Sequence, residues 1–165
     1  MKEIKIETLI RECSYTELSD VDKRLVDAAK SATRRSYAPY SKFHVGAAIL
    51  MENGEIVTGA NQENAAYPSG TCAERTAAFY ASAQYPGVGM RKIAIAAWTA
   101  LHTDAQSDFE SGYQLNPISP CGACRQALLE YETLYGPMEV ILYGREKIYI
   151  LPSVKSLLPL CFTEF

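Results

Sequence analysis

The segment KIAIAAW (Lys92–Trp98) constrains the fold most, because it is short and almost entirely apolar. A strand that is apolar on both of its faces has to be covered on both of its faces, which is typical of a central strand in a sheet between helical layers. Two more strand-like runs, 43–51 and 55–62, flank Asn53-Gly54. Both residues of that pair tolerate positive φ, so the three features together predict a hairpin beside a buried strand.

Helical patterns alternate with these strands. An amphipathic stripe runs from Val21 to Ala32 after Ser19, an alanine-rich helix is predicted over 72–83, and another is predicted over 120–132. Two strands (138–144 and 146–151) and a short helix (153–158) follow. This order predicts an α/β fold, a three-layer α/β/α sandwich whose mixed sheet of about five strands carries helices on both faces.

The chain reads as one domain, residues 1–165. It has an N-terminal arm, residues 1–18, that begins as a strand or an extended arm, and a polar insert, residues 99–118, without clear periodicity. The 165 residues fall within the usual size of a single domain, about 100–200 residues.

Charge and hydropathy exclude several classes of partner. Sixteen Lys and Arg against 19 Asp and Glu give a net charge of −3, and no basic cluster larger than that around Arg34-Arg35 occurs, which argues against a nucleic-acid partner. No apolar run approaches the ~18 residues of a membrane span. The first residues lack the apolar core of a secretion signal, so we expect a cytoplasmic protein and no membrane partner.

Five cysteines in a reducing compartment point to metal binding or catalysis more than to disulfides. Cys121 and Cys124 form a C-x-x-C at a predicted helix start, with Ser119 as cap and Pro120 in the first position. Positions i and i+3 share a helix face, so both sulfurs can meet Cys72 from the start of the other helix. Three ligands leave one zinc position open, as in catalytic sites. A closed four-cysteine site and a thioredoxin-like redox pair are the alternatives.

Glu74 lies two residues after Cys72, where a carboxylate can act as general base without ligating the metal. Alternatively, Thr71 and Glu74 form a helix capping box. Zinc with three thiolates carries a net charge of −1, so a neighbouring cation is expected to offset it. Arg75 can donate to the cysteine sulfurs in that role, or be a solvated helix residue.

Four blocks of this sequence, YAPYSKFHVGAA, GANQENAAY, TCAERTA and SPCGACRQ, resemble the small nucleoside-type cytidine deaminases in the expected order, over about residues 35–162. Cys72-x-Glu74 with Pro120-Cys121-x-x-Cys124 is similar to the three-cysteine variant of the zinc deaminase signature. The resemblance implies one Zn²⁺ per subunit and hydrolytic deamination of cytidine and 2′-deoxycytidine at C4, a step of pyrimidine salvage. Glu74 would carry protons from water to N3 and to ammonia. It also implies a homotetramer with composite active sites.

The resemblance assigns further residues to the substrate. Phe43 would pack against the pyrimidine, Asn61 and Glu63 would bind the ribose 3′-hydroxyl, and the backbone of Ala73 and Pro120 would line the base pocket. The residues expected to reach a neighbouring subunit's site are Tyr67 and Phe162. Phe43 and Phe162 also fit ordinary core packing, and Asn61 and Glu63 also fit a turn. The insert 99–118 and the arm look longer than in compact family members.

Three other functions compete with this one. A sibling enzyme would apply the same chemistry to another aminopyrimidine, such as a blasticidin-type antibiotic; Asn61 and Glu63 favour the ribose-bearing substrate. A polynucleotide-editing deaminase would need a basic groove, which the acidic balance disfavours. A non-catalytic zinc-stabilised interaction domain would need a fourth protein ligand, and neither Cys13 nor Cys161 has a paired spacing.

Overall fold

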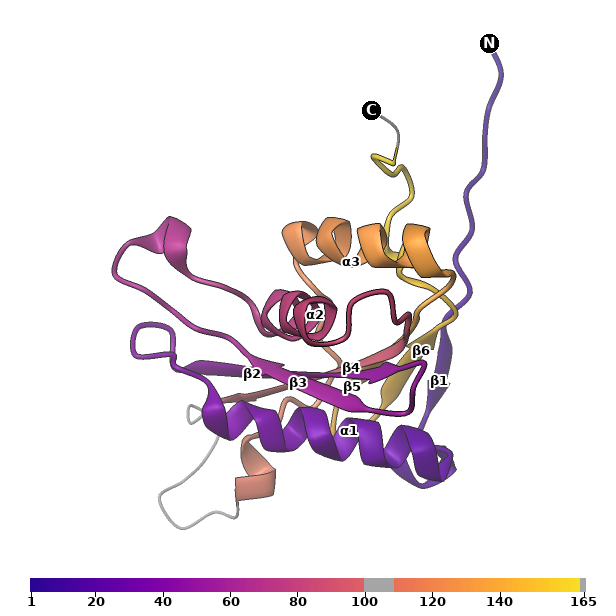
Figure 1. Cartoon of the computed structure of the whole chain (residues 1–165). Coiled ribbons are helices and arrows are strands. Elements are labelled where there is room, and N and C mark those ends of the chain that lie inside the picture. Colours follow the sequence, from indigo (N-terminus) through magenta and orange to yellow (C-terminus); the bar gives the residue numbers. More distant parts are fainter. Residues whose placement is uncertain (100–108, 164–165) are drawn as a thin grey trace.

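The computed structural model describes residues 1–99 and 109–163, in which six strands form one mixed sheet of order β1-β6-β5-β4-β2-β3 (Figure 1). The strands are β1 (Arg11–Cys13), β2 (Phe43–Met51), β3 (Ile56–Ala60), β4 (Met90–Thr99), β5 (Glu139–Tyr143) and β6 (Ile148–Leu151). β4 and β5 are parallel, and the other neighbours are antiparallel.

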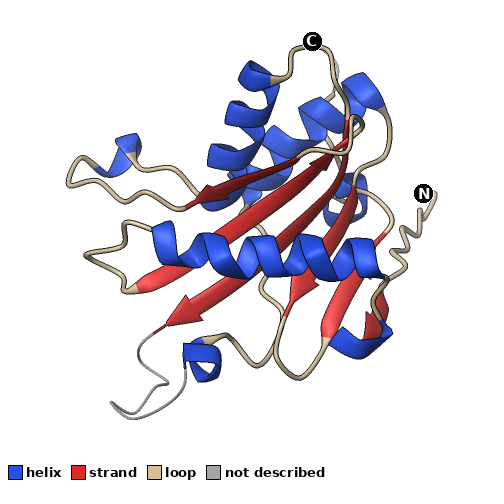
Figure 2. Ribbon diagram, turned by 60° about the horizontal axis from the view of Figure 1, so that its bottom comes forward, coloured by secondary structure: helices blue, strands red, loops and turns tan. Residues whose placement is uncertain are grey.

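Helices cover both faces of the sheet, which confirms the predicted three-layer sandwich. Helix α1 (Asp20–Ala32) packs on one face, whereas α2 (Ala73–Gln84) and α3 (Gly122–Tyr135) lie on the other (Figures 1 and 2). The central strand β4 is buried from both sides as predicted. Ile93 and Ile95 join the core under α2 and α3, and Ala94 joins the core under α1.

The sixth strand is β1, for which the sequence left open a strand or an arm. Three residues pair antiparallel with β6 at the sheet edge, while residues 1–10 form no helix or strand and Thr8 Oγ1 donates to the carbonyl of Ser156 at 3.0 Å (Figure 1). A second difference concerns the C-terminal region. The predicted helix over 153–158 is a single 3₁₀ turn, Val154–Leu157, capped by the hydroxyl of Ser153. Pro152 and Pro159 on either side leave too few residues for an α-helix.

Two strand glycines let helices approach opposite faces of the sheet closely. A Cβ on Gly46 would lie 2.1 Å from the carbonyl oxygen of Ala29 in α1, and a Cβ on Gly59 would lie 2.4 Å from the amide of Ala77 in α2. Any side chain at either position would therefore push a helix away from the sheet. Gly59 matters for function because it fixes the first turns of α2 against β3.

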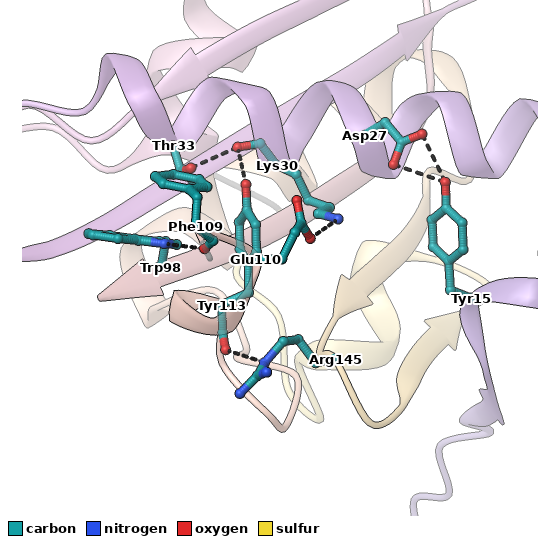
Figure 3. A network of polar contacts seen from close by, with 9 residues as sticks. All are labelled: Tyr15, Asp27, Lys30, Thr33, Trp98, Phe109, Glu110, Tyr113 and Arg145. Atoms are coloured by element: carbon teal, nitrogen blue, oxygen red, sulfur yellow. Dashed lines mark hydrogen bonds and ion pairs between the residues drawn. The ribbon is translucent and has the colours of Figure 1, made fainter. Parts of the chain in front are cut away.

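The described half of the insert packs on the α1 face. A 3₁₀ turn, Phe109–Gly112, follows residues 100–108, which lie outside the described residues. Trp98 Nε1 donates to the carbonyl of Phe109 at 2.9 Å, and the Tyr113 hydroxyl donates to the carbonyl of Lys30 at 2.9 Å (Figure 3). Lys30 also pairs with Glu110 at 2.7 Å. These hydrogen bonds and the ion pair fix residues 109–113 to α1 and to the end of β4.

Membrane-spanning helices are not found in the described ranges, where each helix is too short or too polar to cross a bilayer.

Candidate metal and catalytic site

Three sulfurs converge at the start of the two helices that share a sheet face. Cys72 Sγ lies 3.9 Å from Cys121 Sγ, and Cys121 Sγ lies 3.5 Å from Cys124 Sγ. All three ligand atoms lie within 4.8 Å of one another, and no other such group of His, Cys, Asp and Glu is found in the described residues. This confirms that the predicted cysteine cluster assembles in space.

Each helix begins at a cysteine. Cys72 is the N-cap of α2, Cys121 is the N-cap of α3, and Cys124 occupies the third position of α3. Neither cap sulfur accepts a hydrogen bond from a backbone amide of its helix, so neither is used for capping. The partial positive charge of two helix N-termini favours the thiolate forms at this point.

The prediction of Ser119 as cap and Pro120 as first residue of α3 is wrong, because α3 begins at Gly122. Ser119 instead accepts a hydrogen bond from Arg125 at 2.9 Å. The capping-box reading of Thr71 and Glu74 is wrong for a similar reason. With Cys72 as N-cap, Glu74 is the second helical residue and is out of register for a capping box.

The three sulfurs fit a zinc ion. Tetrahedral ligands with Zn–S bonds of about 2.3 Å place sulfurs about 3.8 Å apart, and the separations of Cys121 Sγ from Cys72 Sγ and from Cys124 Sγ, 3.9 and 3.5 Å, bracket that value. Cys124 is buried and Cys121 is exposed, so the cluster sits at the boundary between core and solvent. Three protein ligands with a solvent-facing side are the donor set of a catalytic zinc site.

Arg75 lies against the cluster as expected for a compensating cation. Its Nη2 is 3.8 Å from Cys72 Sγ, and its buried Nε has no hydrogen-bond partner within the described part of the chain. A hydrogen bond from Cys124, followed by the effect of Arg75, lowers the pKa of Cys72 to about 5. The Cys124 thiol keeps the proton of that hydrogen bond, and the bond to Cys72 together with burial raises the pKa of Cys124. The cluster therefore already stabilises a thiolate next to a guanidinium.

Glu74 is 5% exposed on the first turn of α2. Burial is the largest cause that raises the pKa of its carboxyl group above the ordinary value, and the negative charge of Cys72 adds to it. A carboxyl group with a raised pKa takes up a proton more readily than an exposed one, which favours general acid–base catalysis.

A cavity of about 530 Å³ opens beside the cluster, and Cys72 is part of its wall. Three of the substrate residues expected from the resemblance, Asn61, Glu63 and Tyr67, line the same cavity. Its volume falls within the usual range of small-molecule sites, about 300–1,000 Å³. The structure thus brings the expected ribose-binding pair and one sulfur of the cluster, that of Cys72, to one cavity.

Asn61 is held rigidly at the end of β3. Its Oδ1 accepts from the hydroxyl of Ser36 at 2.5 Å and from the amide of Val45 at 2.8 Å, and its Nδ2 donates to the carbonyl of Phe43 at 2.9 Å. An amide nitrogen carries two hydrogens, so this arrangement leaves one N–H of Asn61 for a ligand.

Glu63 is oriented by the loop before β2. Its Oε2 accepts from the backbone amides of Tyr40 at 2.9 Å and Ser41 at 3.3 Å. Hydrogen bonding, with Ser41 as the largest cause, lowers the pKa of Glu63, so this carboxyl group is an anionic acceptor.

The remaining expected residues have different surroundings. Ala73 is fully buried at the start of α2, and Pro120 is buried with its carbonyl bonded to Arg125 at 2.8 Å. Phe43 is half-buried at the first position of β2. Tyr67 and Phe162 are 81% and 66% exposed, so neither belongs to the core of this chain.

Sequence reasoning missed the residues that orient the substrate pair. Ser36, Tyr40 and Ser41 hold Asn61 and Glu63, although Tyr40 and Ser41 lie in the YAPYSKF block itself. It also missed Arg125, whose three side-chain nitrogens all donate to loop atoms. Arg125 stands directly after the second cysteine of CGAC, and that position was the available signal.

Comparisons with known proteins agree with this site. The family model described as the cytidine and deoxycytidylate deaminase zinc-binding region matches residues 19–135. A cytidine deaminase from Sporosarcina psychrophila is 40% identical over 145 residues, which are 88% of this chain and 93% of the relative. A probable cytidine deaminase from Dictyostelium discoideum is 34% identical over 142 residues, 86% of this chain and 84% of the relative.

Solved structures give the same result. Cytidine deaminase from Burkholderia pseudomallei aligns with a TM-score of 0.67 and 39% identity, over 84% of this chain and 97% of that structure. Cytidine deaminase from Mycobacterium tuberculosis aligns with a TM-score of 0.64 and 28% identity, over 88% of this chain and 99% of that structure. With the sulfur cluster, the fold and these relatives in agreement, the chain belongs to the cytidine and deoxycytidylate deaminase family.

Proposed function

We propose that this chain hydrolyses the 4-amino group of cytidine and 2′-deoxycytidine, which yields uridine or 2′-deoxyuridine and ammonia. One observation carries the proposal: the sulfurs of Cys72, Cys121 and Cys124 meet at two helix N-termini, with the buried carboxyl group of Glu74 on the adjoining turn. The same reaction would serve pyrimidine salvage.

The three cysteines would hold one zinc ion, which when bound lowers the pKa of a water molecule so that it can attack C4 at neutral pH. Glu74 takes a proton from the attacking water and delivers it to N3 of the pyrimidine. It then takes the remaining proton from the hydroxyl group added at C4 and passes it to the amino group, which leaves as ammonia while the C4 carbonyl forms. Its burial supports this role, because a carboxyl group with a raised pKa shuttles a proton at lower cost than an exposed one. Arg75 offsets the net negative charge of the thiolates.

Asn61 and Glu63 are the residues that select a nucleoside. A ribose hydroxyl both donates and accepts, and the remaining N–H of Asn61 together with the Glu63 carboxylate supplies the complementary pair. Phe43 would pack against the base, and the backbone of Ala73 and Pro120 would border it. Recognition of the sugar favours cytidine over aminopyrimidines that lack a ribose.

We infer a homotetramer whose active sites are shared between subunits. Tyr67 lines the cavity and is 81% exposed, which is unusual for an aromatic residue at a binding site unless another surface covers it. Phe162, also exposed, would enter the site of a neighbouring subunit. A cytoplasmic location agrees with the cysteine chemistry, since three free thiols stay reduced there.

The decisive experiment follows the ultraviolet absorbance of cytidine with the zinc-loaded protein and Glu74→Gln. The variant is expected to retain zinc and to lose about 10²–10⁴-fold in kcat, the usual contribution of a general acid–base group. Glu130→Gln, an exposed glutamate on α3, is the matched control and should be fully active. Unchanged turnover in Glu74→Gln would remove the carboxyl group from the mechanism.

A second assay distinguishes an enzyme that recognises a nucleoside from a sibling enzyme that acts on another aminopyrimidine. Asn61→Ala removes the N–H that would bind the ribose hydroxyl. Each loss of about 1.4 kcal/mol in binding free energy corresponds to a factor of ten, so KM for cytidine should rise tenfold or more. Turnover of free cytosine, which carries no ribose, should not respond to the same substitution. Equal effects on both compounds would show that Asn61 only supports the loop.

A further inference from the structure

Arg125 connects two segments that lie far apart in sequence and meet at the proposed active site. Its Nε donates to the Pro120 carbonyl at 2.8 Å and its Nη2 donates to the Ser119 hydroxyl at 2.9 Å. Its Nη1 donates to the carbonyl of Leu157 at 3.0 Å, 32 residues further along the chain. One planar group therefore fixes both the loop that leads into Cys121 and the C-terminal segment.

The C-terminal segment is held along the whole length of α3. Near the end of α3, Glu132 accepts from the amides of Val154 and Lys155 at 2.7 and 3.1 Å. Near the start of α3, Arg125 holds Leu157, and Gln126 Nε2 donates to the carbonyl of Phe162 at 2.9 Å. The segment thus runs antiparallel to α3 and ends beside the turn that carries Cys121 and Cys124.

The three acceptors of Arg125 are two carbonyls and one hydroxyl, so the geometry of the guanidinium, and not ion pairing, determines what it does here. A guanidinium presents its donors in a rigid plane in fixed directions, whereas an ammonium group is a compact point charge on a flexible stem. Lysine at this position would keep the positive charge and lose the simultaneous contact with both segments.

We propose that Arg125 is a positioning residue that sets the Pro120–Cys121 loop against the C-terminal segment, so that the base-side backbone and the segment that leads to Phe162 are placed by the same side chain. The inference rests on the proposed function for its kinetic consequence. Its structural consequence, coupling of the two segments, stands on the hydrogen bonds alone.

The test compares Arg125→Lys and Arg125→Gln with the parent protein and with Arg24→Gln, an exposed arginine on α1. Both Arg125 variants should raise KM for cytidine about tenfold or more, with a smaller change in kcat, since lost hydrogen bonds to a charged donor correspond to at least that factor. Hydrogen exchange of the amides in 157–163 should accelerate by a similar factor. Arg24→Gln should change neither quantity.

Two milder variants keep the test interpretable if Arg125→Gln folds poorly. Gln126→Ala should accelerate exchange near Phe162 while zinc affinity, measured by competition with a chromophoric chelator, stays unchanged. Ser119→Ala removes one of the three acceptors of Arg125 and should raise KM for cytidine less than Arg125→Lys does.

Normal KM and normal exchange in Arg125→Lys would overturn the proposal, because charge alone would then suffice. If the parent protein fails to deaminate cytidine, the proposed function falls, and hydrogen exchange in the Arg125 variants still decides whether Arg125 couples the two segments.

Discussion

The two faces of the sheet each carry a dense polar cluster, and the clusters differ in what their groups contact. Under α1, Lys30, Glu110 and Tyr113 pair with one another and with backbone atoms (Figure 3). Under α2 and α3, the sulfurs of Cys72 and Cys121 lie at helix N-termini and accept no hydrogen bond from the backbone amides there. The first cluster is complete and stabilises structure, whereas the second is arranged to receive a ligand.

On both faces of the sheet, a helix packs in close contact with a glycine of a strand. The missing side chain of Gly46 leaves room for α1, and that of Gly59 leaves room for α2. Only α2 carries functional groups at the end that packs on the glycine, since Cys72 and Glu74 lie about one turn before Ala77. The α1 face therefore serves stability, whereas the face under α2 and α3 also carries the chemistry.

The largest effect is expected from Cys124→Ala. Removing the buried sulfur leaves two ligands, so zinc should be lost on dialysis and activity should fall at least about a thousandfold, the scale of losing metal-assisted water activation. Cys13→Ala is the control, because Cys13 lies on the opposite side of the sheet, packed with the α1 core. Metal analysis and the cytidine assay measure both quantities. Zinc retained at full occupancy in Cys124→Ala would disprove the three-sulfur site.

Next come Gly46→Ala and Gly59→Ala. Both should lower the free energy of unfolding by about 1–3 kcal/mol, because each added methyl group meets helix backbone. Only Gly59→Ala should also weaken zinc binding and raise KM, since it displaces the start of α2. Chemical unfolding and chelator competition give the two readouts. Equal loss of zinc affinity in both variants would mean that the faces are not independent.

A smaller effect is expected at alkaline pH. Burial by itself lowers the pKa of Lys30 and of Lys92, but their acidic partners outweigh it and raise both pKa values, and burial raises the pKa of Tyr113. A group whose pKa is raised on folding contributes stability below its unfolded pKa, about 10 here, and loses it as the pH rises through the folded value. Urea unfolding should therefore show stability falling above pH ~10. A flat profile to pH 11.5 would contradict this.

The smallest effect belongs to Glu110→Gln. The Glu110 side chain is 55% exposed, so its ion pair with Lys30 should contribute no more than about 1 kcal/mol. Activity and zinc content should equal those of the parent protein. A loss of activity in this variant would show that the α1 face also contributes to the chemistry on the opposite face.

Sequence reasoning predicted the layers well because their signals are local. The apolar run of β4, the Asn53-Gly54 turn and the stripe of α1 each specify an element within a few residues, and all three are found. The edge strand β1 was ambiguous, because its strand form depends on pairing with β6, more than 130 residues later. Long-range pairing of this kind leaves no periodic trace in three residues.

The site shows the same division. The cysteine spacing predicted the sulfur cluster, since i and i+3 on a helix converge for local reasons. The exact helix starts were wrong by two residues at α3 because cysteine is a weak cap, so Ser119-Pro120 looked like the better start. The supports of Asn61 and the reach of Arg125 to Leu157 depend on tertiary contacts and could not be read from the chain.

The sulfurs of Cys72 and Cys121 are separated by 49 positions, so an ion held by both closes a loop of that length. The entropy of closing a flexible loop grows only with the logarithm of its length, about 0.6 kcal/mol for each doubling. Extra residues between the two halves of the cluster are therefore inexpensive as long as they stay on the surface. Chain length in this interval is free to drift in evolution while the chemistry at its two ends stays fixed.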